Sequence, residues 1–334
     1  MRAAASDDSA ADRQISSPPA SIDQSPWAWW RKQMPICGKW AYFDHAAVAP
    51  LSGPAADASR LFVDQAVTSG DTVWPAWAAK IEHLRRSTAE LLGADPAEIC
   101  MIPNTSTGIS LVAEGWPWQR GDNVIVPEGE FPSNLFPWLN QRQRGVEVRL
   151  VPRHDGEVRV EDLIDRVDAR TRIIAVSWVG YASGYRIDID SLVQQAHQRG
   201  VLVFLDAIQG LGVFPLDVSN VSVDFLAADG HKWLLGPEGA GIAMIRREHL
   251  DKLRAGNVGW GSVKNSHDYK NPVFELRDTA ARFESGSANM IGAAALSASM
   301  DLFLQIRRHH GEDAIAARIL ELTVDLDRQL REAG

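Results

Sequence analysis

The sequence predicts an α/β protein with a mostly parallel sheet that is covered by helices on both faces. Two observations lead to this prediction. Short apolar runs alternate with segments of helical periodicity between residues 99 and 245. The runs are apolar at successive positions, as in strands buried on both faces, and 45% of the 334 residues are hydrophobic, enough for a large core.

The elements can be assigned in order along the chain. A short strand that breaks into a loop is expected within 41–47, and two helices follow, the second ending at Gly93. Further strands are expected at 99–102, 124–126, 146–151, 173–176, 201–205, 225–228 and 241–245. A turn at 103–108 leads into a helix, and another helix starts at Asp188 or Asp190 and stops at Gly200.

The two ends of the chain depart from this pattern. Residues 1–25 are rich in Ala, Ser, Asp and Pro and are expected to form a disordered tail, which the aromatic cluster 27–30 would anchor to the body. A long helical stretch starts at Ile291 and is expected to break near 309–311. The sequence stops directly after helix-like residues, so a last domain that is truncated is one expectation.

Composition excludes several classes of function. The net charge of −9 argues against binding to nucleic acid or to an anionic membrane, both of which need a basic surface. No apolar run has the length of a transmembrane helix, and the first residues lack the apolar core of a secretory signal. Cys37 and Cys100 form no CxxC motif, so reduced thiols and a cytoplasmic location are expected.

Two polar residues stand at or shortly after the ends of expected strands. Asp206 ends the run 201–205, and Lys232 lies in a Gly- and Pro-rich loop after 225–228. Ligands bind beyond the carboxyl ends of parallel strands, where both side chains would lie. A lysine in an apolar setting can form Schiff bases, and a buried carboxylate keeps the ring nitrogen of pyridoxal phosphate protonated. Taken singly, they would be a surface lysine and a helix N-cap; together they predict a pyridoxal-phosphate site.

A candidate phosphate site lies in the turn at 105–108, between an expected strand and a helix. Its hydroxyls and backbone N–H groups could hold a phosphate, although a capping Thr or Ser would look the same. His231 could donate to the phosphate, whereas Asp229 is an awkward neighbour unless it takes its bonds from the backbone. The chain has no GxxxxGK[ST], HExxH or paired CxxC motif, and no metal site is predicted.

Five collinear motifs resemble the class V aminotransferase family of pyridoxal-phosphate enzymes. They are YFDHAAVAP, PNTSTGISLVAEG, LDAIQG, DGHKWLLGPEGAG and RFESGSAN. The resemblance covers roughly residues 40–300 and implies fold type I, with a mainly parallel seven-stranded sheet, a smaller α+β domain and a homodimer with shared active sites. The implied division is a small-domain segment at 26–50, a large cofactor-binding domain at 51–290 and the start of a C-terminal small domain at 291–334.

The resemblance also implies roles around the cofactor ring. Lys232 would form the internal aldimine and later move the Cα proton of an amino-acid substrate. Asp206 would pair with the pyridine nitrogen, and Gln209 would bond to the ring hydroxyl. Phe131, in the motif EFPSN, would stack on the ring where many relatives have a histidine or an aromatic residue.

The remaining implied roles concern the phosphate. Thr105, Ser106 and His231 would hold it, and Ser287 stands where the family often has a threonine that reaches the phosphate of the other subunit. Asp229 replaces the usual serine or threonine two residues before the histidine, which removes one phosphate donor.

Other departures bear on the reaction. Neither Cys37 nor Cys100 matches the desulfurase cysteine, and nothing matches the family's arginine for the substrate carboxylate. The sequence therefore favours an aminotransferase or an isopenicillin N epimerase-like enzyme acting on an amino acid. A cysteine desulfurase or selenocysteine lyase, and a catalytically silent cofactor-binding protein, stay open as alternatives. A nicotinamide dehydrogenase is disfavoured because the glycine-rich stretch 236–241 precedes a strand.

Overall fold

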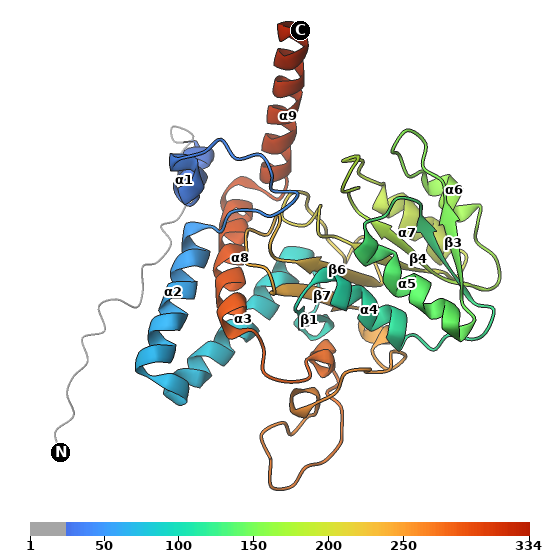
Figure 1. Cartoon of the computed structure of the whole chain (residues 1–334), viewed down its shortest axis with the longest axis horizontal. Coiled ribbons are helices and arrows are strands. Elements are labelled where there is room, and N and C mark those ends of the chain that lie inside the picture. Colours follow the sequence, from blue (N-terminus) through green and yellow to red (C-terminus); the bar gives the residue numbers. More distant parts are fainter. Residues whose placement is uncertain (1–24) are drawn as a thin grey trace, which may run out of the picture.

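The computed structural model describes residues 25–334, which form one seven-stranded sheet with helices packed around it (Figure 1). The strand order is β1-β7-β6-β5-β4-β2-β3. Within the described residues, β7 is antiparallel to both β1 and β6, and all other neighbouring strands pair in parallel. The strands are β1 Ile99–Ile102, β2 Asn123–Pro127, β3 Glu147–Val151, β4 Thr171–Ser177, β5 Leu202–Asp206, β6 Phe225–Asp229 and β7 Gly241–Ile245. The predicted, mainly parallel sheet is confirmed.

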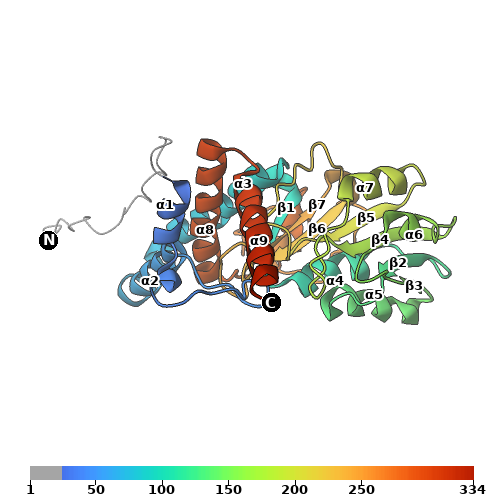
Figure 2. The same cartoon turned by 90° about the horizontal axis from the view of Figure 1, so that it is seen from above.

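The helices lie on both faces of this sheet, as Figure 2 shows from above. Helices α4 and α5 cover one face, and α6 and α7 cover the other. The bounds are α1 Pro26–Lys32, α2 Gly53–Thr68, α3 Trp74–Leu92, α4 Thr105–Gly115, α5 Phe136–Asn140, α6 Val160–Ile164, α7 Ile189–His197, α8 Met290–His310 and α9 Ala314–Ala333. The predicted end of α3 at Gly93 is confirmed, because Gly93 caps the helix in the left-handed region at φ 64°.

Two hydrophobic cores sandwich the sheet because successive strand residues point to opposite faces. In β5, Phe204 faces the core beneath α4 and α5, where its ring meets that of Trp138 edge-on at 5.7 Å. Its neighbours Val203 and Leu205 face the other core, with α3, α6, α7 and α8. Both faces of β5 are thus apolar until the strand ends at Asp206, which is why its sequence shows no alternation.

The strand expected within 41–47 is wrong. These residues form an extended segment and then a turn at 45–47. They pass over the carboxyl ends of the strands instead of pairing with a sheet edge, and their polar contacts go to loops. Gln209 Nε2 donates to the Ala46 carbonyl at 2.9 Å, and the Ala49 N–H donates to the His231 carbonyl at 2.8 Å. Small residues there do let the backbone approach another group, as expected.

The two ends of the described chain pack against each other. In α1, Trp29 is buried, and the ring of Trp30 meets Phe303 of α8 edge-on at 5.3 Å. The tail expected at 1–25 lies outside the described residues except for Ser25. The long helix predicted from Ile291 is present and breaks at Gly311 into α8 and α9, and α9 projects from the body (Figure 1). The domain boundaries at 26–50, 51–290 and 291–334 stay a prediction.

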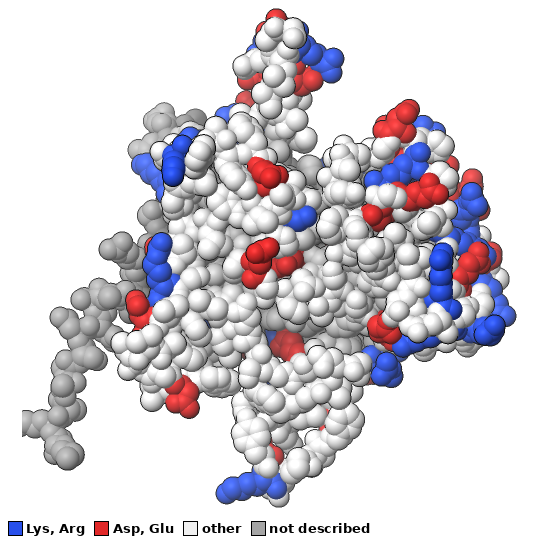
Figure 3. Space-filling model, viewed as in Figure 1, with Lys and Arg blue, Asp and Glu red and all other residues white. Residues whose placement is uncertain are grey.

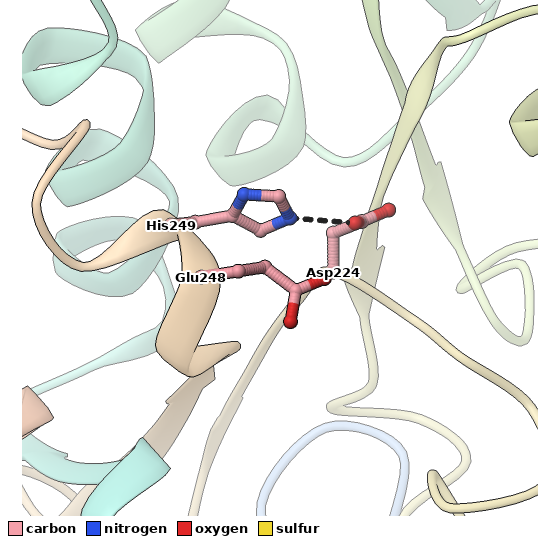
Figure 4. A group of neighbouring side chains, drawn as sticks. All are labelled: Asp224, Glu248 and His249. Atoms are coloured by element: carbon pink, nitrogen blue, oxygen red, sulfur yellow. Dashed lines mark hydrogen bonds and ion pairs between the residues drawn. The ribbon is translucent and has the colours of Figure 1, made fainter.

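A buried aspartate ties the elements together at the amino end of β6. Asp224 accepts hydrogen bonds from the Val203 N–H, His197 Nε2 and His249 Nε2, each at 2.8 Å. Figure 4 shows the bond from His249. Glu248 lies within 4.8 Å of Asp224 and His249, a spacing at which a metal ion could be held. The Nδ1 atom of His249 accepts from a lysine ammonium, however, so its Nε2 carries the hydrogen donated to Asp224. We therefore assign this cluster a structural role.

The surface carries charges of both signs. On the face shown in Figure 3, basic and acidic side chains are interspersed at the periphery, and much of the centre is uncharged. Among the described residues, no helix is both long and apolar enough to cross a membrane. The cytoplasmic location expected from the sequence stays a prediction.

Candidate active site

A cavity of about 460 Å³ opens at the carboxyl ends of the parallel strands. It contains every site residue predicted from the sequence except Ser287. Its lining consists of Asp44, Ala46, Ala47, Asn104, Thr105, Ser106, Phe131, Ser133, Tyr181, Asp206, Ile208, Gln209, Asp229, His231 and Lys232. Loops after five different strands bring these side chains together, which is the geometry expected for a ligand site on such a sheet.

Asp206 forms the floor of this cavity. It is the last residue of β5 and is 3% exposed. One carboxylate oxygen accepts from the Ile208 N–H at 3.1 Å, and within the described chain no protein donor contacts the other oxygen. Burial raises the pKa of Asp206 to about 7; the Glu130 carboxylate adds to the rise, and the Ile208 hydrogen bond and Lys232 oppose it. The side chain is thus a buried acid with an unused oxygen facing a cavity.

Lys232 enters the cavity from the turn that follows β6. Its Nζ atom lies 5.6 Å from the centre of the Phe131 ring. Partial burial lowers the pKa of Lys232, while Asp206 and Asp229 act in the opposite direction. A lowered pKa enlarges the neutral fraction of the amine, and the neutral amine is the nucleophilic form.

The amino end of α4 supplies unpaired N–H groups at one wall of the cavity. Asn104 caps this helix by accepting from the Thr107 N–H at 2.9 Å. The Thr105 hydroxyl is buried and accepts from the Asp229 N–H at 3.0 Å, which leaves its own hydrogen free to donate. Ser106 shares a hydrogen bond of 2.7 Å with Ser133. Helix N–H groups with hydroxyls around them form a site for an anion.

Asp229 does take bonds from the backbone, which resolves the difficulty of a carboxylate beside that wall. One oxygen accepts from the Gly230 N–H at 2.7 Å, and the other lies 2.9 Å from Nδ1 of His231. The carboxylate is thereby turned toward its own loop and lies beside the imidazole of His231, which lines the cavity and whose Nδ1 atom makes no hydrogen bond within the described residues.

Gln209 joins the cavity to the segment before α2. Its amide nitrogen donates to the Ala46 carbonyl, and its amide oxygen accepts from Trp233 Nε1 at 2.9 Å. The Trp233 ring in turn stacks on His45 at 5.4 Å, with the ring planes 16° apart. The amide keeps one N–H free for a ring oxygen, while its other N–H and one lone pair of its oxygen hold this loop in place.

Phe131 and Tyr181 form the opposite wall. Their rings meet edge-on at 5.2 Å, and both are about half exposed. Phe131 is the N-cap of a short 3-10 helix after β2, and Tyr181 follows β4. A flat apolar ring on this wall is suited to stacking, whereas it cannot exchange protons as a histidine would.

Ser287 does not join this group. It lines a second cavity of about 270 Å³, together with Thr107, Asn257 and neighbouring residues of the loop before α8. The amino end of α4 borders both cavities, because Ser106 lines the first and Thr107 lines the second.

Four polar residues of the site were missed by sequence reasoning. Asp44, Asn104 and Ser133 line the cavity, and Glu130 is buried beside it. Asn104 could have been found, since it is the residue before the predicted helix start and has a preferred N-cap side chain. Nothing in the local pattern singles out Glu130, whose partners come from β4 and from the loop after β3.

Comparison with known proteins identifies the family. Residues 41–334 match the model of the aminotransferase class-V family. This chain belongs to that family. A probable cysteine desulfurase from Methanothermobacter thermautotrophicus is 32% identical over 284 residues, which are 83% of this chain and 70% of that relative. Another from Pyrococcus abyssi is 29% identical over 278 residues, 81% of this chain and 68% of that relative.

Solved structures of such proteins share the fold. The apo cysteine desulfurase from Thermococcus onnurineus superimposes with a TM-score of 0.79 at 26% identity, over 90% of this chain and 76% of that one. A C-DES variant with glycine covalently linked to its pyridoxal-phosphate cofactor gives a TM-score of 0.84, over 90% and 80% of the two chains. At 24% identity the latter shows the fold alone. The fold is that of the type I pyridoxal-phosphate enzymes, and this class V chain is an enzyme dependent on that cofactor.

The cavity fits the cofactor that the family uses. The buried carboxylate of Asp206 has one oxygen without a protein donor, as a partner for a protonated ring nitrogen requires. Lys232 supplies the amine, and the amino end of α4 with Thr105 and His231 supplies the anion site. Each chemical feature of pyridoxal phosphate therefore has a matching group in one cavity.

Proposed function

We propose that the enzyme removes the α-proton of an amino acid bound at the Lys232 cavity. The observation that carries this proposal is the presence of a partly buried amine, a buried carboxylate and an anion site around one cavity. Pyridoxal phosphate, when bound, supplies an electron sink for the carbanion that this deprotonation leaves. Lys232 would hold the aldehyde carbon of the cofactor and, once released by the substrate amine, would act as the base at Cα.

The other residues would bind and orient. Asp206 would hold the proton on the ring nitrogen, and Gln209 would donate its free N–H to the ring oxygen. Phe131 would stack on the ring and exclude water from that face. We assign Thr105, Ser106 and His231 to the phosphate, with Asp229 beside the imidazole of His231.

The decisive experiment is substitution of Lys232. Lys232→Ala should lose the visible absorbance of the lysine-bound cofactor and the exchange of Cα hydrogen with solvent deuterium across a panel of amino acids. Lys80→Ala, at an exposed position of α3, is the matched control and should keep both signals. Visible absorbance in Lys232→Ala equal to that of the native chain would refute the assignment. Absorbance without exchange in the native chain would support a silent cofactor-binding protein.

The names of the relatives favour a second candidate, a cysteine desulfurase or a related lyase. The positions of the cysteines argue against a desulfurase. Cys100 is fully buried in β1, and burial raises the pKa of its thiol far above the usual range. Cys37, in the 3-10 turn after α1, packs against the core that contains α3 and α8, and neither cysteine lines the Lys232 cavity. We therefore rank transamination or epimerisation above desulfuration.

This ranking can be tested with L-cysteine as substrate. A desulfurase converts it to alanine with transfer of sulfur to a protein thiol, so the activity would disappear in Cys37→Ala or Cys100→Ala. Our ranking predicts no cysteine-dependent alanine formation in the native chain. Alanine production that either substitution abolishes would reverse it.

Ser287 is best explained by a homodimer. We propose that the second cavity faces a partner subunit and that Ser287 reaches the phosphate bound there, which accounts for its distance from the cavity of its own chain. Sedimentation should give twice the chain mass, and Ser287→Ala should weaken cofactor binding only in the dimer. A monomer with full cofactor affinity would contradict this proposal.

A further inference from the structure

Glu130 is a buried carboxylate next to the cavity, and it has no role in the proposed reaction. It stands directly before Phe131 in the loop after β2, and its side chain is 1% exposed. Burying a carboxylate is costly unless charged or hydrogen-bonding partners compensate for the loss of water. Glu130 therefore needs partners within the protein.

Those contacts lead to Asp206. One oxygen of Glu130 accepts from the Ser177 N–H at 2.9 Å, and the other accepts from the Ser177 hydroxyl. The register of β4 and β5 sets Ser177 directly opposite Asp206, and the next N–H, of Trp178, donates to the Asp206 carbonyl. Glu130 is therefore fixed to the strand position that flanks the buried aspartate.

The nearest cation does not neutralise Glu130 fully. Arg153 Nη2 lies 3.6 Å from the carboxylate, beyond hydrogen-bond range, and its Nε atom has no hydrogen-bond partner. The charged groups that act on Asp206 are thus Glu130 from the loop after β2 and Lys232 from the loop after β6, with Arg153 behind Glu130. Asp206 therefore has a carboxylate on one side and an amine on the other, and Arg153 pairs with Glu130 and not with Asp206.

We propose that Glu130 is a positioning residue that strengthens the hold of Asp206 on a proton-bearing ring nitrogen. This proposal rests on the proposed function, in which Asp206 faces that nitrogen. A fixed negative charge behind Asp206 makes its carboxylate a stronger proton acceptor. The same charge favours the protonated ring, which is the form that withdraws electrons from Cα. Burial and Glu130 act in the same direction on the pKa of Asp206.

The test follows the titration of Asp206 in the 334-residue chain without requiring turnover. Chemical denaturation between pH 4 and pH 8 is measured for the native chain and for Asp206→Asn, and the difference between them gives the titration midpoint of Asp206. Glu130→Gln keeps the size of the side chain and removes its charge. It should move this midpoint down by about one pH unit. In an Asp206→Asn background, Glu130→Gln should add no pH dependence.

Ser177→Ala is the matched control because it removes a hydrogen bond to Glu130 but keeps the charge. A midpoint lowered equally by Ser177→Ala and Glu130→Gln would overturn the proposal, since the effect would then come from loop position. An unchanged midpoint in Glu130→Gln would overturn it as well.

A second measurement separates this inference from the proposed function. Pyridoxal phosphate is titrated into each variant, and its affinity should fall severalfold more steeply with rising pH in Glu130→Gln than in Ser177→Ala. Failure of the native chain to bind the cofactor would refute the proposed function. The titration of Asp206 would in that case still decide whether Glu130 acts on it.

Discussion

One buried aspartate lies at the carboxyl end of β5, and another lies at the amino end of the neighbouring strand β6. Their pKa values are shifted in opposite directions. Asp206 at the carboxyl end of β5 and Asp224 at the amino end of β6 are each 3% exposed. Asp206 has one donor, and burial raises its pKa to about 7. Asp224 has three donors, and hydrogen bonds from His197 and His249 outweigh burial and lower its pKa.

This contrast shows that donors, not depth, decide what a buried carboxylate does. The protein supplies hydrogen-bond donors for Asp224, and these bonds hold α7, β5 and the segment after β7 together. Asp206 is left short of donors and faces a cavity, so a ligand can complete its bonding. A perturbed acid in a cavity is a marker of function, and a satisfied one outside a cavity is a marker of structure.

The largest expected effect is loss of the structural carboxylate. Asp224→Ala leaves the N–H groups of His249 and Val203 without an acceptor in a buried place, and it removes the acceptor of the partly exposed His197. We expect it to lower the free energy of unfolding by about 3–5 kcal/mol, measured by denaturant titration. Asp190→Ala, at an exposed position in the first turn of α7, should change it by less than about 0.5 kcal/mol. Equal losses of unfolding free energy in Asp224→Ala and Asp190→Ala would contradict the structural role assigned to Asp224.

Replacing Asp206, at the carboxyl end of β5, is expected to raise the free energy of unfolding above pH 7 instead of lowering it. In the chain without cofactor, the folded state holds the proton on Asp206 up to about pH 7, whereas the unfolded state loses it near pH 3.8. Stability should therefore fall as the pH rises between these values and stay low above pH 7. Asp206→Asn should abolish this fall and be more stable than the native chain at pH 8, by up to about 4 kcal/mol. A native chain whose stability rises from pH 4 to pH 7, relative to Asp206→Asn, would contradict this.

The same contrast explains which features could be predicted from the sequence. The sheet, Asp206, Lys232 and the turn at Thr105 follow from local rules: apolar runs form buried strands, and ligands bind at their carboxyl ends. The function proposed for Glu130 could not be predicted, because it depends on the register that sets Ser177 opposite Asp206. The prediction of a strand at 41–47 is wrong because an extended segment packed on loops has the same apolar pattern as a strand.

Removing one of the three donors should have an intermediate effect. His249 is buried against Phe225, with their ring centres 5.1 Å apart. His249→Phe keeps a ring in this place but deprives Asp224 of one hydrogen bond, which we expect to cost about 1–3 kcal/mol. His309→Phe at the exposed end of α8 is the control and should be close to neutral. Calorimetric unfolding of both variants would show whether Asp224 needs all three donors, and a loss equal to that of Asp224→Ala would mean that it does.

The smallest expected effect concerns pH at the structural end. A hydrogen bond from His197 to Asp224 raises the pKa of His197 above 6.5, although burial opposes the rise. Because the folded value is the higher one, the protonated pair stabilises the fold fully below pH 6.5, and this contribution disappears as the pH rises through the folded value. About a third of the side chain is exposed, so solvent limits the effect to less than about 1 kcal/mol. His197→Gln keeps a donor without the charge and should flatten the dependence of stability on pH between 6 and 8. If the slope in that interval survives the substitution, the charge on His197 does not contribute, and Asp224 is held by neutral hydrogen bonds alone.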